Sequence, residues 1–291
     1  MHRRPRTPTA LLTAAALLLA ACAADEPEPS AAGFIDDGAT MIVANSPGTL
    51  SVNGPQRVMV ALVGTEPNSF FGDAELDAEL TFFAPDGSTT VDATAEYLAT
   101  EGVALGLYVA TASFDQPGRW SVALVGTEAP GGRTELDVAE ESLVPEPGDP
   151  APASETPVAT ALADIADIST DSEPNPDFYD LTVAEAVANG RPTVIAFATP
   201  AFCLTALCGP TMDTVKRVVG DDDAFDVVHV EPYDIDEARA GQLIPVESMF
   251  EWQLVSEPWV FVVDDEGLVT ASFEGTVGAE ELGAAVDAAR P

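Results

Sequence analysis

The feature that most constrains the fold is a stretch in the second half of the chain, where an apolar run, two cysteines and a helical pattern follow one another. Residues 193–198 form a short apolar run rich in β-branched side chains, which predicts one buried strand. Cys203 and Cys208 come next, and a helical pattern then runs from about Pro210 to Gly220. A cysteine between a strand and a helix start lies in the field of the helix dipole, which lowers the pKa of its thiol.

This stretch resembles the active-site region of thioredoxin-like proteins. The similarity covers about residues 179–290 and includes Glu257-Pro258, which resembles the cis-proline loop of that superfamily. The resemblance implies a thioredoxin-like α/β domain, a cis-proline at Pro258 that shapes a substrate groove, and Glu257 close to the nucleophilic sulfur. It also implies that Cys203 and Cys208 carry out thiol–disulfide exchange.

The spacing of the cysteines leaves two assignments open. The chain has Cys-x4-Cys where thioredoxins have Cys-Gly-Pro-Cys. In one register Cys203 is the attacking thiolate and Cys208 resolves the mixed disulfide, which is the assignment that we expect. In the other register, residues 208–211 (Cys-Gly-Pro-Thr) occupy the place of the thioredoxin motif, and Cys203 is the available partner.

The same spacing sets a geometric condition on a disulfide. On a regular helix, residues five positions apart have Cα atoms about 8–9 Å apart, whereas a disulfide needs a Cα separation within about 7 Å. Either the segment from Cys203 to Cys208 is a loop with a preformed bridge, or oxidation must unwind a helical turn. The pair is therefore interpreted as a redox pair, with a structural staple as the alternative.

Two other resemblances compete with this interpretation. The Thr199-Pro200 pair before the cysteines is similar to Q-type peroxiredoxins, but these need an arginine near the peroxide, and no basic residue is beside the Pro258 strand. Thioredoxin-fold copper chaperones use a cysteine pair with a late histidine. Here His229 alternates with valines in a predicted strand and is expected to be a satisfied core residue. We therefore expect no cofactor and no metal.

The N-terminus has the pattern of an export signal. Residues 1–21 combine a basic start with a short apolar stretch, and residues 19–22 (Leu-Ala-Ala-Cys) resemble a bacterial lipobox. The resemblance implies cleavage before Cys22 and lipidation of its thiol; the alternative is an ordinary signal peptide. We expect a protein that is anchored by lipid at the extracytoplasmic face of the cell membrane, where a disulfide can persist.

The charge of the chain excludes one class of partner. Its formal net charge is −38, with 49 acidic residues against 11 lysines and arginines. Such a surface repels phosphate backbones and anionic lipid headgroups. Nucleic acid is therefore not an expected partner, and attachment to the membrane is expected only through the N-terminal lipid.

The remaining patterns divide the chain into regions. Residues 34–139 contain short β-rich runs separated by turn signals, which predict an immunoglobulin-like sandwich. The predicted strands are Arg57–Gly64, Glu79–Ala84, Gly106–Ala112 and Trp120–Gly126. A tether (22–33) precedes this domain, and an acidic, proline-rich linker (140–175) follows it. The thioredoxin-like domain would then occupy residues 176–291.

The predicted fold class is thus an all-β sandwich followed by an α/β thioredoxin-like domain. The predicted function is thiol–disulfide exchange on extracytoplasmic protein thiols or disulfides. One alternative is a binding or scaffolding lipoprotein with a structural disulfide, and a second is a Q-type peroxiredoxin-like peroxidase.

Overall fold

The computed structural model describes residues 40–64, 70–72, 78–100, 106–125, 132–159 and 161–291. The predicted signal peptide (1–21), the lipidation residue Cys22 and the tether (22–33) lie outside these residues. Among the helices that the structure describes, none combines the length and the apolar character needed to cross a bilayer.

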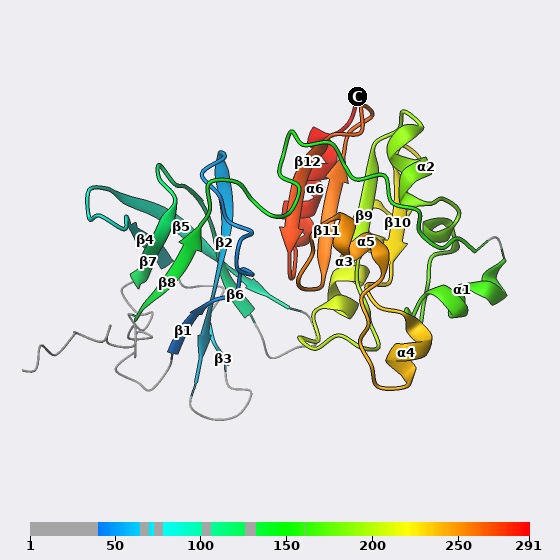
Figure 1. Cartoon of the computed structure of the whole chain (residues 1–291), viewed down its shortest axis with the longest axis horizontal. Helices are drawn as coiled ribbons and strands as arrows, with labels where there is room; N and C mark the ends of the chain where they lie inside the picture. The colour runs from blue at the N-terminus through cyan, green and yellow to red at the C-terminus, as the bar shows by residue number, and fades with distance from the viewer. Residues whose placement is uncertain (1–39, 65–69, 73–77, 101–105, 126–131, 160) are drawn as a thin grey trace, which may run out of the picture. The chain divides into compact units, whose positions relative to one another are not determined.

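The first part of the chain is an antiparallel sheet (Figure 1). Its strands are β1 (Thr40–Val43), β2 (Pro55–Val63), β3 (Phe70–Phe71), β4 (Ala78–Phe83), β5 (Thr90–Ala99), β6 (Gly106–Ser113), β7 (Gly118–Val125) and β8 (Gly132–Val138). They follow the order β1-β2-β6-β5-β4-β7-β8, and β3 pairs with β2. Alternate side chains such as Phe82 and Trp120 are fully buried in one apolar core, as period-two strands with one buried face require.

The long strand β5 joins what would otherwise be two sheets. Its first half, through Ala95, pairs with β4, and its second half, from Glu96, pairs with β6. The two ends of the strand path also approach each other, since β1 contacts β8 and Ser51 forms a parallel bridge with Ala139. The eight strands therefore form one continuous, nearly closed sheet around a single core.

The second part contains a smaller sheet with short helices. Its elements are α1 (Leu162–Ile168), the 3₁₀ helix η1 (Pro176–Tyr179), α2 (Val183–Ala188), β9 (Thr193–Phe197), α3 (Cys208–Val219), β10 (Asp226–Val230), α4 (Ile235–Arg239), α5 (Glu247–Glu251), β11 (Trp259–Val263), β12 (Val269–Glu274) and α6 (Ala279–Ala288). The strand order is β10-β9-β11-β12, and only the β9–β10 pair is parallel. A capping box begins α2, where the side chains of Thr182 and Glu185 each accept a hydrogen bond from the backbone amide of the other.

Each face of the smaller sheet has its own apolar core. One core joins Val194 and Val260 of the strands to Met212 of α3 and Leu282 of α6. The other core joins the oppositely directed side chains to α2 and to Met249 of α5. All five residues of β9 and all five of β11 are buried, because the sheet is covered on both faces.

The predicted fold class is wrong. Strands account for 35% of the structure and helices for 21%, and the second sheet with its helices does not form a clear α/β thioredoxin domain. The predicted immunoglobulin-like sandwich of two packed sheets is replaced by one continuous sheet, because β5 changes partners along its length. In the second sheet, β11 runs antiparallel to both of its neighbours, β9 and β12, and only the β9–β10 pair is parallel. The β11–β12 pair is antiparallel because the short turn at residues 264–267 returns the chain directly from one strand to the other.

The segment predicted as a proline-rich linker is fixed in place. The amide of Gly148 donates to the carbonyl of Val269, the first residue of β12, and the amide of Ala151 donates to the carbonyl of Gly267, in the turn before that strand. Farther along, the buried hydroxyl of Ser154 accepts a hydrogen bond from the indole of Trp252. The predicted linker is therefore tied to the second sheet by backbone hydrogen bonds, and its later part includes the helix α1.

Candidate functional site: a free cysteine pair beside a buried glutamate

The two cysteines are held by the turn between β9 and α3. Cys208 is the first residue of α3, and Cys203 lies in the preceding turn. Ala206 has a left-handed φ of 61°, so the turn cannot continue the helix backwards. Both cysteines are free thiols. The structure matches neither expected alternative in full: the segment from Cys203 to Cys208 is a loop, but the two thiols are not joined by a preformed bridge.

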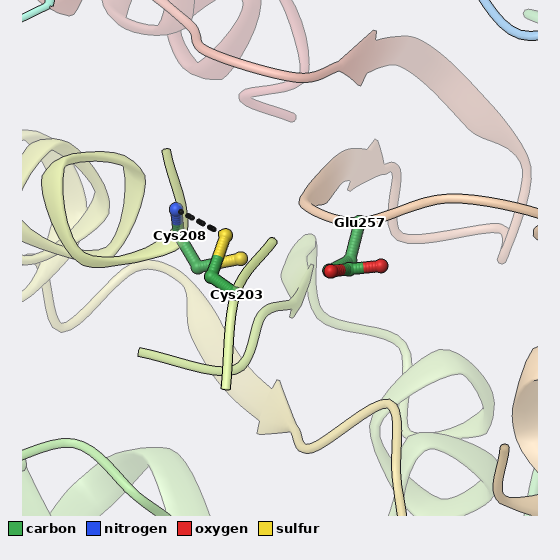
Figure 2. Close-up of side chains that lie close together, drawn as sticks. All are labelled: Cys203, Cys208 and Glu257. Carbon is green, nitrogen blue, oxygen red and sulfur yellow. Dashed lines mark hydrogen bonds between the residues drawn. The ribbon is translucent and has the colours of Figure 1, made fainter. Parts of the chain in front are cut away.

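The sulfur of Cys203 faces the N-terminus of the helix. The backbone amide of Cys208 donates to Cys203 Sγ at 3.2 Å (Figure 2). The hydroxyl of Thr205 lies 3.3 Å from the same sulfur. A helix leaves its first amides without partners inside the helix, and they carry partial positive charge. This environment therefore favours the thiolate of Cys203.

The surroundings shift the pKa values of the two thiols in opposite directions. A hydrogen bond from the Cys208 thiol, followed by one from Thr205, lowers the pKa of Cys203 to about 5. The Cys208 thiol donates that hydrogen bond and is fully buried, so its pKa lies far above the ordinary value. Of the two thiols, the half-buried Cys203 is therefore the one that ionises more readily, and the buried Cys208 is the one that retains its proton.

Glu257 approaches the sulfurs from the loop before β11. One of its carboxylate oxygens and the two sulfurs lie within 4.8 Å of one another, and the close-up in Figure 2 shows the three side chains together. The Glu257–Pro258 peptide bond is cis, as the resemblance predicts. Burial, with a further contribution from Cys203, raises the pKa of the Glu257 carboxyl. Tyr233 holds that side chain, since its hydroxyl donates to Glu257 Oε2 at 2.7 Å.

The arrangement supplies the three groups that thiol exchange needs. Cys203 is an activated nucleophile, Cys208 is a second thiol within reach, and Glu257 is a carboxylate able to accept a proton beside them. Three of the residues predicted from the sequence, Cys203, Cys208 and Glu257, therefore lie together, and Pro258 follows Glu257 through a cis peptide bond. Two sulfurs and a carboxylate are also donor groups for a borderline metal ion.

Two contacts in this site could not be found from the sequence. Thr205 and Tyr233 touch the key atoms, but neither stands in a motif. Tyr233 follows β10 and reaches Glu257 across 24 positions of sequence. A polar aromatic residue in a loop gives no signal of such a contact, because the pairing is set by the tertiary arrangement.

His229 is a satisfied core residue, as the sequence predicts. It is buried in β10; its Nε2 lies 2.9 Å from the carbonyl of Ala198, and its Nδ1 lies 2.8 Å from the hydroxyl of Tyr179. Ser169 extends this network through the same hydroxyl. Burial lowers the pKa of His229. The imidazole is therefore neutral in the folded protein and positions the end of β9 just before the cysteine turn.

The neutral state of His229 predicts a pH-dependent stability. Because its folded pKa lies below the unfolded value of about 6.5, the unfolded chain binds more protons as the pH falls below that value. Stability should then fall by up to about 1.4 kcal/mol per pH unit from this one group. Urea unfolding of the wild type and of His229→Asn at pH 7.5 and 5.5 measures it. His229→Asn should be less stable than the wild type at pH 7.5, but its stability should fall less between pH 7.5 and pH 5.5. Equal losses of stability in the two proteins would contradict a neutral, buried His229.

Comparison with known proteins gives no assignment for this site. No protein-family model matches the chain, and a search of curated proteins finds no similar sequence.

Proposed function

We propose that the protein is a lipid-anchored, extracytoplasmic thiol–disulfide exchange protein that uses Cys203 and Cys208. The observation that carries this proposal is the contact of Cys203 Sγ with the amide at the start of α3, beside a second free thiol. A fixed staple needs neither a stabilised thiolate nor a neighbouring carboxylate. The resemblance of the cysteine segment and the Pro258 loop to thioredoxin-like active sites supports the same chemistry.

The exchange proceeds in two displacements. The Cys203 thiolate attacks a disulfide of the partner protein, so a mixed disulfide forms and one partner sulfur leaves as a thiolate. Cys208 then gives its proton to Glu257 and attacks Cys203 Sγ, which releases the second partner thiolate. The partner gains two electrons, and the pair becomes a disulfide. The reverse sequence oxidises a partner dithiol.

The expected substrates are protein thiols or disulfides outside the cytoplasm. Cys203 is half-buried and its neighbour Leu204 is 80% exposed, so a partner chain is able to reach the sulfur. The strongly acidic chain would favour partners without a large negative surface.

Trapping of mixed disulfides tests the proposal. Cys208→Ser keeps the attacking thiolate but removes the resolving thiol, so covalent complexes with disulfide proteins should accumulate and dissolve with reductant. Cys203→Ser is the matched control and should trap nothing. Equal trapping by both variants, or none by Cys208→Ser in a folded protein, would show that the pair serves another purpose.

The membrane anchor gives a separate prediction. Because residues 19–22 fit a lipobox, Cys22→Ser should abolish incorporation of a labelled fatty acid and release the protein from the membrane fraction. Cys203→Ser, which leaves the N-terminus intact, is the control and should label normally. Unchanged labelling of Cys22→Ser would contradict lipidation at this residue.

A further inference from the structure

The cysteine site has a second chemical capacity besides exchange. Cys203 Sγ, Cys208 Sγ and a carboxylate oxygen of Glu257 all lie within 4.8 Å of one another. In tetrahedral zinc sites, metal–sulfur bonds of about 2.3 Å and metal–oxygen bonds of about 2.0–2.2 Å place ligand atoms roughly 3.5–4 Å apart. A small adjustment of the side chains would therefore bring all three donor atoms onto one ion.

We propose that the reduced Cys203–Cys208 pair and Glu257 form a binding site for Zn²⁺. The proposal goes beyond thiol exchange, because it requires only that both thiols are reduced. It also replaces the expectation from sequence that the chain holds no metal. That expectation rested on the position of His229 inside a predicted strand, but the carboxylate that completes the donor set comes from a loop 49 positions after Cys208.

The donor set favours zinc among the common metal ions. Two thiolates exclude a hard cation such as Mg²⁺ or Ca²⁺, which prefers oxygen ligands. A carboxylate as the third donor suits Zn²⁺, which accepts sulfur and oxygen together, better than Cu⁺, which prefers soft sulfur ligands. Three protein ligands leave one tetrahedral position for solvent on the partly exposed side of Cys203.

The surroundings of the site have the features of a supported metal centre. Glu257 is buried and its Oε2 accepts a hydrogen bond from Tyr233, the kind of outer contact that orients a ligating carboxylate. Cys203 Sγ also accepts the amide hydrogen of Cys208. In the described residues, these three side chains are the one group of potential ligands that meets this distance limit. A divalent ion would neutralise the repulsion among three groups that can each become anionic.

Cobalt substitution in the whole, reduced chain tests the site. Co²⁺ bound by thiolates in a tetrahedral site gives a sulfur-to-cobalt charge-transfer band and intense d–d bands. We expect one Co²⁺ per chain, displaced by one Zn²⁺. Cys203→Ser and Cys208→Ser should each lose the charge-transfer band, and Glu257→Gln should weaken binding at least tenfold. Tyr233→Phe should weaken it by about tenfold, since outer contacts contribute about 10–100-fold.

Two controls keep the outcome decisive. Glu251→Gln removes an exposed carboxylate from the end of α5 and should leave affinity unchanged, which separates the site from the general acidity of the surface. If the buried Cys208 variant fails to fold, zinc should still slow alkylation of Cys203 in the wild type. Weak, octahedral cobalt bands that survive both cysteine variants, or alkylation unaffected by zinc, would overturn the zinc site. Neither result alters the trapping test of thiol exchange.

Discussion

Replacement of Cys203 by serine is expected to reduce thiol–disulfide exchange to the uncatalysed rate. A serine hydroxyl at this position accepts the same amide hydrogen from Cys208, but it supplies no thiolate to attack a disulfide. The wild-type pKa of about 5 keeps Cys203 almost wholly ionised at pH 7. An ordinary cysteine, with a pKa of about 8.5, is ionised to only a few per cent.

Two further variants separate the steps of the reaction. Cys208→Ser should retain the first, single-turnover attack and lose multiple turnover. Glu257→Gln should leave the first attack nearly intact and slow the release of the partner by about a hundredfold, because general acid–base catalysis contributes about 10²–10⁴-fold. Stopped-flow reaction with a chromogenic disulfide, together with alkylation by iodoacetamide, measures both steps. Full activity in Cys203→Ser would mean that Cys208 is the nucleophile and that the other register is correct.

Replacement of Trp252 by alanine is expected to cause a large loss of folding stability. The indole is fully buried and its ring centroid lies 4.6 Å from that of Phe261 and 5.3 Å from that of Phe197. Its Nε1 donates to Ser154 Oγ at 3.1 Å. A buried tryptophan replaced by alanine typically costs about 3–5 kcal/mol, and here the variant also leaves the buried hydroxyl of Ser154 without its donor.

Urea unfolding followed by circular dichroism measures this effect. Phe250→Ala is the matched control, because Phe250 belongs to the same helix, α5, but is 63% exposed. It should change stability by no more than about 0.5 kcal/mol. A loss below about 1 kcal/mol in Trp252→Ala would show that the segment around Ser154 is not held against the second sheet.

The local elements near the site could be predicted from sequence because their signals are local. The apolar run of β9, the capping box of α2 and the turn between β11 and β12 each depend on residues a few positions apart. The strands predicted around Arg57, Leu80, Tyr108 and Trp120 also correspond to β2, β4, β6 and β7. These patterns record burial and backbone geometry directly.

The arrangement of the first sheet could not be predicted in the same way. Strand β5 was missed, because its half-buried positions Val91 and Ala93 alternate with exposed polar residues and give a weak apolar signal. The change of its partner from β4 to β6 depends on tertiary pairing and leaves no mark in composition. Without β5, the four strong strands are typical of two packed sheets, so the sequence predicts a sandwich where the structure has one continuous sheet.

The cysteine site, too, could be predicted from the sequence only in part. The sequence identifies Cys203 and Cys208 through their position between strand and helix, and Glu257 through its place beside Pro258. It does not reveal that Tyr233 holds the carboxylate. Nor does it decide between loop and helix for the cysteine segment, which depends on the left-handed backbone at Ala206.

The reduction potential of the Cys203–Cys208 pair tests the proposed function most directly. The whole chain is equilibrated in a series of thiol redox buffers, alkylated, and assayed by intact mass for the fraction with a disulfide. Structural disulfides have potentials below about −300 mV, whereas working pairs are less stable as disulfides. We expect a reversible two-electron transition above about −300 mV. A potential below that value, or no disulfide under oxidising buffers, would contradict thiol–disulfide exchange.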